Sequence, residues 1–515
     1  MKLTIPALAL LLAFSPAHAA FMIFPDGAPT AEGGVKDALE AYKRGDFPEA
    51  LKLFSAEADR GDKEAQFALG RIYQEGSGVA QSIAKAEEYY RKAALSGHAN
   101  AQSNLGIILL NTQRADEGIA LLRKAAKGGS TRAMVLMGNL LLTGTGIPKN
   151  PTEAKTMLEQ AADKGDPEAY ESLSLMYETG EGVEKNPGKA IDLLENAAKR
   201  NSVKALLRLA IKNLNGDGTA KNPGKTVELL TRASELGSTD AQTALGSMFE
   251  TGEGVLKNAG TAITWYTKAA EAGDPNAALK LGVLFSEGAE GVEKDDRKAM
   301  ESFRRAADRG QTVAMYNVGT YYEKGRGVAA NPAESLKWHL KAAMSGLGLA
   351  QREIGLRYRE GRGMVKDSVA AISWLGRAAG TGDTQGALAL ADMLLTGEGG
   401  MAPDVKNAIA ILTRASELGL APAQVRLAEV HASGVEGRPD LIRAYALTLA
   451  AGKDFEPAVK LKTELEGKMS KEQLAEANKE YERLKAKPAE APAAGAAKDG
   501  AGAAKGGAAV GEAKP

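Results

Sequence analysis

The sequence predicts an all-α fold, a right-handed superhelical solenoid of tandem antiparallel helix pairs. Three observations predict it: a regular period, helix start and stop signals in register, and columns of small residues. Each repeat ends in a residue suited to helix termination, and the first two, Gly61 and Gly97, lie 36 residues apart. The residues that end the later repeats are Gly129, Gly165, Asn201, Gly237, Gly273, Gly310, Gly346, Gly382 and Gly419. Such a period indicates one two-helix repeat stacked many times.

Helix signals divide each repeat into a helix A and a helix B. In the fourth repeat, Asp166-Pro167-Glu168 is a typical helix start, with a capping side chain, a proline in the first turn and an early acid. Gly180 ends that helix, since glycine readily adopts the left-handed conformation of a C-terminal cap. Asn186-Pro187 then starts helix B, and Asn150, Asn222 and Asn331 recur at the same place before proline.

Small residues recur inside helix A where a helix normally avoids glycine. Gly70, Gly106 and Gly138 occupy one column, and an aromatic such as Tyr73 follows three residues later. Glycine inside a helix costs up to ~1 kcal/mol relative to alanine. Its recurrence therefore indicates a close crossing between helices.

The first repeat displays the full pattern. It reads Ala65, Leu69-Gly70, Tyr73, Gly76-Ser77-Gly78-Val79, Ala86, Tyr89-Tyr90 and Lys92-Ala93-Ala94. This pattern resembles the Sel-1-like repeat, a relative of the tetratricopeptide repeat, and the resemblance covers residues 61–455 in eleven copies. The second, fifth, seventh and tenth repeats depart from the pattern in length or consensus. We interpret these irregular repeats as places where curvature breaks or a partner docks.

The flanking regions complete the predicted domain organisation. Residues 21–60 contain a tetratricopeptide-like helix pair, residues 456–485 form C-terminal capping helices, and the Ala-, Gly-, Lys- and Pro-rich residues 486–515 form a disordered tail. Residues 1–20 read as a cleavable signal peptide with Lys2, an apolar run over residues 3–14 and the cleavage motif Ala17-His18-Ala19. The apolar run is shorter than the roughly 20 residues that span a bilayer. We expect a periplasmic or secreted protein without a membrane span after signal cleavage.

Composition excludes several classes of chemistry. The chain has 65 basic and 65 acidic residues and no cysteine, which argues against nucleic-acid binding, disulfides, thiolate metal sites and a lipidated N-terminus. The only histidines after the signal, His98, His339 and His431, fall in distant repeats. Because each solenoid repeat touches only its neighbours, we expect no metal site, no catalytic triad and no cofactor.

Two tempting motifs are explained by the repeat. The stretch from Gly218 to Thr226 looks like a phosphate-binding loop, but five residues separate its glycines where four are required, and it follows a helix. Trp265, Trp338 and Trp374 all occupy the column of Tyr89, which indicates packing within the repeat.

We therefore predict a non-enzymatic protein-interaction scaffold or adaptor of the bacterial cell envelope or secreted space, which binds a protein along a concave surface lined by helix A. The candidate contact residues lie after the alanine column or further along helix A: Gln66, Gln102, Tyr170, Gln242, Gln351, Arg71, Arg208 and Arg357.

Two alternatives remain open. Resemblance to cysteine-rich relatives implies a β-lactamase-like hydrolase, although those relatives staple each repeat with a disulfide that this chain lacks. The other alternative is a peptidoglycan- or polysaccharide-binding envelope factor, in which the tail lysines Lys498, Lys505 and Lys514 contact cell-wall polymer.

Overall fold

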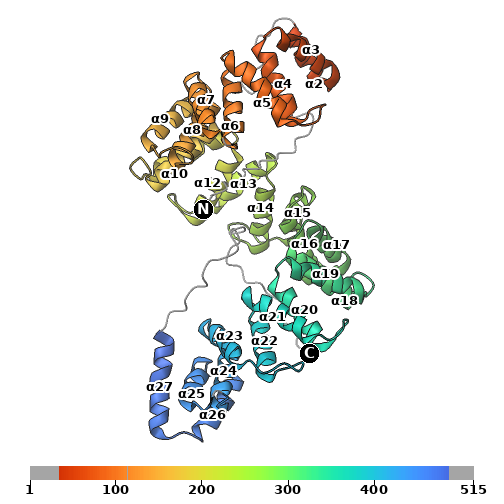
Figure 1. Cartoon of the computed structure of the whole chain (residues 1–515), viewed down its shortest axis with the longest axis vertical. Helices are drawn as coiled ribbons and strands as arrows, with labels where there is room; N and C mark the ends of the chain where they lie inside the picture. The colour runs from red at the N-terminus through yellow and green to blue at the C-terminus, as the bar shows by residue number, and fades with distance from the viewer. Residues whose placement is uncertain (1–33, 113, 436, 487–515) are drawn as a thin grey trace. The chain divides into compact units, whose positions relative to one another are not determined.

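The computed structural model describes residues 34–112, 114–435 and 437–486 of the chain. The predicted signal peptide and most of the predicted tail lie outside these residues. The chain divides into an N-terminal unit that ends at Ala272 and a C-terminal unit that begins at Gly273. Within the described ranges, every regular element is an α-helix, and one isolated β-bridge joins Ala289 and Val292. Figure 1 shows the helices following one another in tandem pairs, which confirms the predicted all-α repeat fold.

The helices have nearly uniform lengths. Those of the N-terminal unit are α2 (Gly34–Lys43), α3 (Phe47–Asp59), α4 (Lys63–Glu75), α5 (Ile83–Leu95), α6 (Ala99–Leu110), α7 (Ala115–Lys127), α8 (Thr131–Thr143), α9 (Pro151–Asp163), α10 (Pro167–Thr179), α11 (Pro187–Lys199), α12 (Val203–Asn215), α13 (Pro223–Glu235), α14 (Thr239–Thr251) and α15 (Ala259–Glu271).

The C-terminal unit continues the same alternation. Its helices are α16 (Pro275–Glu287), α17 (Asp296–Asp308), α18 (Thr312–Lys324), α19 (Pro332–Met344), α20 (Gly348–Glu360), α21 (Ser368–Gly380), α22 (Thr384–Thr396), α23 (Val405–Glu417), α24 (Ala421–Ser433), α25 (Leu441–Ala450), α26 (Glu456–Glu466) and α27 (Lys471–Ala486). From α4 to α25, the even-numbered helices are helix A and the odd-numbered helices are helix B of repeats one to eleven.

The predicted start and stop signals form real caps. The Asp166 carboxylate accepts hydrogen bonds from the backbone N–H groups of Glu168 and Ala169, and Gly180 ends α10 with a φ of 81°. Asn201 takes the place of a terminating glycine and adopts a φ of 62°, the only positive φ of a non-glycine residue in the described chain. Local sequence chemistry therefore sets the helix boundaries.

The glycine column marks where helix A and helix B of one repeat cross. A Cβ atom on Gly70 would lie 2.5 Å from the Tyr90 ring, and one on Gly246 would lie 2.6 Å from the Tyr266 ring. In the eighth repeat the corresponding contact joins Gly319 to the His339 ring. The packing reason predicted for these glycines is thus confirmed.

Among the described residues, no helix is long and apolar enough to cross a membrane. The core is instead a series of buried clusters between consecutive helices, rich in alanine and leucine. At the N-terminal end, Tyr42 of α2 and Phe54 of α3 are buried in a core that they share with Leu69 of α4.

Candidate functional site

The predicted glutamines lie on helix A, and three of them turn their amides toward the chain itself. The side-chain Nε2 of Gln66 donates to the carbonyl of Ala58 at 3.1 Å, Gln102 donates to Ala94 at 3.1 Å, and Gln351 donates to Ala343 at 3.1 Å. Each bond joins a helix A to the helix that precedes it, and all three side chains are buried. Their role in partner binding stays a prediction. In the structure they link each helix A to the helix before it.

The other predicted residues are more accessible, apart from Arg357. Tyr170 is half-buried under the guanidinium of Arg200, whose central carbon lies 4.7 Å from the ring centroid. Gln242 is half-buried, and Arg71 forms an ion pair with Glu75 one turn away on the same helix. The remaining two, Arg208 and Arg357, belong to polar clusters between repeats.

A common numbering of helix A explains those clusters. We count positions from the residue after the N-cap residue, so that Ile72 occupies position 10 of the first repeat. Most repeats bury an apolar residue there, including Ile72, Met176, Met248, Leu284 and Met393.

The fifth and ninth repeats place a cation at position 10, Lys212 and Arg357 respectively. Each cation reaches a glutamate at position 12 of the preceding repeat. Lys212 Nζ lies 2.6 Å from Glu178 Oε1, and Arg357 Nη2 lies 2.9 Å from Glu323 Oε1.

The open cluster comprises Glu171, Glu178, Lys204, Arg208 and Lys212 on α10 and α12. Arg208 Nη2 lies 2.7 Å from Glu178 Oε2, and Lys204 Nζ lies 3.2 Å from Glu171 Oε2. Glu171 is buried and also accepts a hydrogen bond from the Ser202 hydroxyl. The charges in this cluster therefore pair across neighbouring helices A.

Two large apolar side chains lie beside the open cluster and remain exposed. Leu175 is 50% exposed and Ile211 is 57% exposed, and both occupy position 9, on α10 and α12 respectively. The Arg208–Glu178 ion pair joins these two helices. Leu175 and Ile211 therefore form an exposed apolar pair beside charges that largely pair with one another.

The closed cluster comprises Glu323, His339, Glu353, Arg357 and Arg362 on α18, α19, α20 and the loop that follows α20. Arg357 Nε lies 2.7 Å from Glu353 Oε1, and Arg362 Nη2 lies 3.1 Å from the same carboxylate oxygen. The Arg357 side chain is only 5% exposed.

His339 completes the closed cluster as a neutral imidazole. Arg357 Nη2 donates to His339 Nδ1 at 3.3 Å, so that the ring proton resides on Nε2, 3.4 Å from the Thr320 hydroxyl. Burial lowers the pKa of His339, and the positive charge of Arg357 lowers it further. Glu353 and Glu323 act in the opposite direction.

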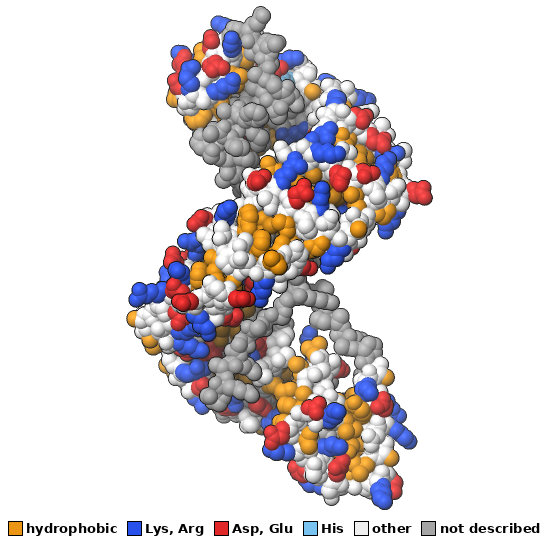
Figure 2. All heavy atoms as spheres, turned by 180° about the vertical axis from the view of Figure 1, so that it is seen from behind, with side chains coloured by type: hydrophobic (Ala, Val, Ile, Leu, Met, Phe, Trp, Pro, Cys, Tyr) orange, Lys and Arg blue, Asp and Glu red, His pale blue; other side chains and the backbone are white. Residues whose placement is uncertain are grey.

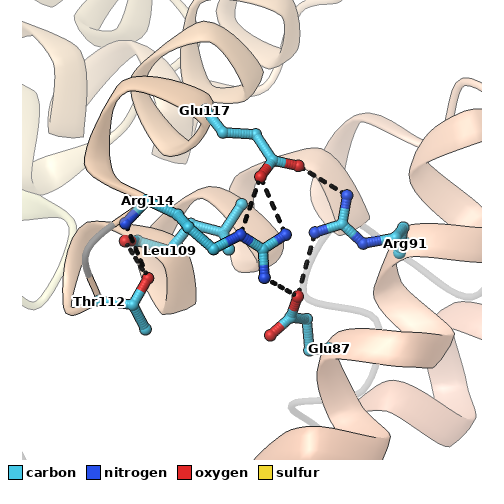
Figure 3. A network of polar contacts seen from close by, with 6 residues as sticks. All are labelled: Glu87, Arg91, Leu109, Thr112, Arg114 and Glu117. Atoms are coloured by element: carbon cyan, nitrogen blue, oxygen red, sulfur yellow. Dashed lines mark hydrogen bonds and ion pairs between the residues drawn. The ribbon is translucent and has the colours of Figure 1, made fainter.

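The shortened second repeat has a polar network of its own, drawn in Figure 3. Arg91 bridges Glu87 at 3.0 Å and Glu117 at 2.6 Å, and Arg114 bridges the same two carboxylates at 2.7 and 2.9 Å. Thr112 donates to the carbonyl of Leu109 at 2.8 Å. Two arginines and two glutamates thus link α5, the short loop and α7.

The structure brings together residues that sequence reasoning did not group. Glu323, Glu353 and Lys204 were not singled out, and His339 was considered only as one of three histidines in distant repeats. The available signal was the cation at position 10, because a charge in an apolar column requires a partner. Within the described ranges, no three His, Asp or Glu side chains are placed to hold a metal ion.

Comparison with known proteins identifies the repeat. The Sel1 repeat matches the chain at residues 63–98, 99–130, 131–166, 167–202, 203–238, 239–274, 275–311, 312–347, 348–383, 384–420 and 421–453. A solved structure of a protective antigen of uropathogenic Escherichia coli strains, described as having an SLR fold, is 25% identical with a TM-score of 0.51. That match covers 84% of this chain and 94% of the antigen.

Two further relatives match smaller regions. A Sel1 repeat protein from Oxalobacter formigenes is 27% identical over 64% of this chain and 95% of its own, with a TM-score of 0.47. The rat DAP3-binding cell death enhancer 1 is 31% identical over 103 residues, which span 20% of this chain and 20% of the rat protein. Since the eleven repeats occupy most of the sequence, the chain belongs to the Sel1 repeat family.

Proposed function

We propose that this protein is an exported interaction scaffold that binds a protein partner through helix A of the fourth and fifth repeats. Proteins built from Sel1 repeats generally serve as protein-interaction scaffolds. Repeat stacking creates an extended surface without requiring catalytic residues. The partner and the envelope location are the specific parts of this proposal.

The exposed pair Leu175 and Ile211 carries the proposal. Burying a large aliphatic side chain on binding contributes roughly 1.5–3 kcal/mol, and interfaces combine such apolar centres with polar rims. The flanking charges already pair with one another across α10 and α12. Figure 2 shows hydrophobic side chains of one face gathered in patches among charges of both signs.

Site-specific photo-crosslinking in living cells tests the binding face. A benzophenone amino acid placed at position 175 or 211 should yield one discrete crosslinked partner. The same group at Leu95 or Leu256, two still more exposed apolar residues outside helix A, should not capture it. Equal capture from all four positions, or none from positions 175 and 211, would contradict the proposed face.

Export is tested separately. The sequence supports cleavage after Ala19 or Ala20. Intact-mass measurement of the native protein should therefore give a chain starting at Ala20 or Phe21, recovered outside the cytoplasm. An unprocessed chain that begins at Met1 and remains in the cytoplasm would overturn this part of the proposal.

A further inference from the structure

Four consecutive helices A in the N-terminal unit present alternating charges at position 2. Arg132 lies on α8, Glu168 on α10, Lys204 on α12 and Asp240 on α14, and all four residues are exposed. We call them the charge row. The order along the solenoid is basic, acidic, basic, acidic.

The C-terminal unit shows that position 2 does not require charge for folding. Its five helices A have uncharged residues there, namely Asn276, Val313, Leu349, Gln385 and Pro422. Position 2 is the acidic Glu64 in the first repeat and the uncharged Asn100 in the second, so the unbroken alternation is confined to repeats three to six.

The charge row makes few ion pairs within the described chain. In the described structure, the side chains of Arg132, Glu168 and Asp240 form no ion pair, while Lys204 contacts Glu171. Desolvation raises the pKa of Glu168, repulsion by Asp166 and Glu171 adds to it, and the nearby cations Lys204 and Arg132 oppose it.

Desolvation also lowers the pKa of Arg132, and its proximity to the Arg71 cation contributes. Arg132 and Glu168 are therefore partly desolvated, and neither has an ion-pair partner in the described structure. Opposite charges supplied by a partner would satisfy them.

Spacing specifies the shape of such a partner. Within the row, α8 contacts α10, and the Lys204–Glu171 and Arg208–Glu178 ion pairs join α12 to α10. Packed helices lie about 8–10 Å apart. Residues seven apart in a partner helix are separated by about 10 Å along its axis and return to nearly the same face. A helix lying across the helices A would thus meet one member of the charge row every two turns.

The width of a partner helix also matches the distance along helix A between the charge row and the apolar pair. The charge row at position 2 and the apolar pair Leu175 and Ile211 at position 9 are separated by seven residues, or about 10 Å along helix A. An α-helix with side chains is about 10–12 Å across. It would contact the charge row with one edge and the apolar pair with the other.

We propose that repeats three to six bind an amphipathic partner helix whose one edge carries acidic and basic residues alternately at seven-residue intervals, and whose other edge is apolar. This proposal rests on the proposed scaffold function and specifies the partner of the same face. Acidic partner residues would lie against Arg132 and Lys204, and basic ones against Glu168 and Asp240.

Four synthetic helical peptides of identical composition, about four heptads long, test the proposal with the full chain. Two carry the edge charges in alternating order, starting with an acid or a base, and two carry them in blocks of two. Fluorescence anisotropy should show one alternating peptide binding about tenfold tighter than either blocked peptide, since each exposed ion pair contributes a small increment. High salt should remove this preference.

A charge exchange provides the decisive variant. Arg132→Glu with Asp240→Arg keeps the net charge and changes the row to acidic, acidic, basic, basic, so that a blocked peptide should become the preferred ligand. Glu168→Lys with Lys204→Glu creates the other blocked order and provides a second test if the first variant unfolds. The matched control, Glu195→Lys with Lys199→Glu on helix B of the fourth repeat, should keep the alternating preference.

Equal affinity for alternating and blocked peptides would overturn the proposal, as would an unchanged preference after the exchange in a folded variant. Persistence of the preference in high salt would also overturn it. Crosslinking from positions 175 and 211 can succeed while these peptide experiments fail, in which case the scaffold stands and the partner chemistry is wrong.

Discussion

Repeats four and five differ sharply from repeats eight and nine, although both pairs share one departure from the repeat pattern. In each, a cation replaces the apolar residue at position 10 and contacts a glutamate at position 12 of the preceding repeat. The Lys212 side chain is 20% exposed, whereas the Arg357 side chain is 5% exposed. The open cluster thus borders a surface, whereas the closed cluster belongs to the core.

Part of this difference in exposure comes from the helix B residue that lies where helix A and helix B cross. The fourth repeat has the apolar Leu194 in the column where the eighth has His339, whose imidazole accepts a hydrogen bond from Arg357. A buried guanidinium needs several acceptors, and His339, Glu353 and Glu323 supply them. A cation at position 10 therefore belongs either to the core or to a surface cluster, depending on the residues that surround it.

The largest expected effect is the difference in stability between variants of the two cations, Arg357 and Lys212. Arg357→Ala should destabilise the region by about 3 kcal/mol, because it leaves buried polar groups without their partner. Lys212→Ala should cost about 1 kcal/mol or less, because water replaces the lost contact. Native-state hydrogen exchange of α18–α20 and α10–α12 measures both locally. Equal losses would mean that the two cations have the same structural role, and Arg357→Met would show how much of the loss comes from packing alone.

Acid should lower the stability of the closed cluster. It should have no such effect in the fourth repeat, which has Leu194 in place of His339. The pKa of His339 is lowered in the folded state, so the unfolded chain binds a proton below about pH 6.5 that the folded chain resists. Stability should therefore fall as pH decreases from about 6.5 toward the folded-state pKa, by up to ~1.4 kcal/mol per pH unit. His339→Leu should abolish this dependence in hydrogen exchange of α18–α20, and its survival would assign the effect to another group.

A smaller loss of stability is expected when the hydrogen bond from Gln351 to the preceding helix is removed. Gln351→Leu gives the ninth repeat the residue that the fifth has at position 4, Leu206, and removes the hydrogen bond to the Ala343 carbonyl. The expected loss is about 1 kcal/mol, seen as faster exchange in α19 and α20. A neutral outcome would mean that the buried glutamine is not a structural link and would sharpen its case as a partner contact.

The smallest effect on stability is expected at the exposed apolar pair. Leu175→Ala and Ile211→Ala should each change the free energy of unfolding by no more than about 0.5 kcal/mol. The fully buried Ile354, at position 7 of the ninth repeat, is the contrasting site, where alanine should cost about 2–5 kcal/mol. Thermal unfolding compares the stability of the three variants. A large loss of stability at position 175 or 211 would show that these residues belong to the core.

Much of the fold was predictable because its signals are local. Asp166, Asn186 and Gly180 act within one turn of their own helix, and the structure places caps where they predict. Repetition then turns many weak signals into one clear period. Gly70 was interpretable for the same reason, since only a close crossing explains repeated glycine inside a helix.

The candidate site was predictable only in part. Arg208 and Arg357 were selected by their helix position, and the structure places both in clusters between repeats. Gln66 was selected in the same way, but its amide donates a hydrogen bond to Ala58 in the preceding helix, α3. Helix position indicates a face, whereas the direction of a polar side chain depends on the nearest acceptor.

The repeat, its boundaries, its family resemblance and the scarcity of residues for histidine- or cysteine-based chemistry could all be predicted from the order of the amino acids. Which charges are buried, which partners they contact and which apolar side chains stay exposed became visible only in the folded chain. The reason is physical. Capping and periodicity depend on residues a few positions apart, whereas desolvation and ion pairing depend on neighbouring repeats about 30 or more residues away, as Arg357 and Glu323 illustrate.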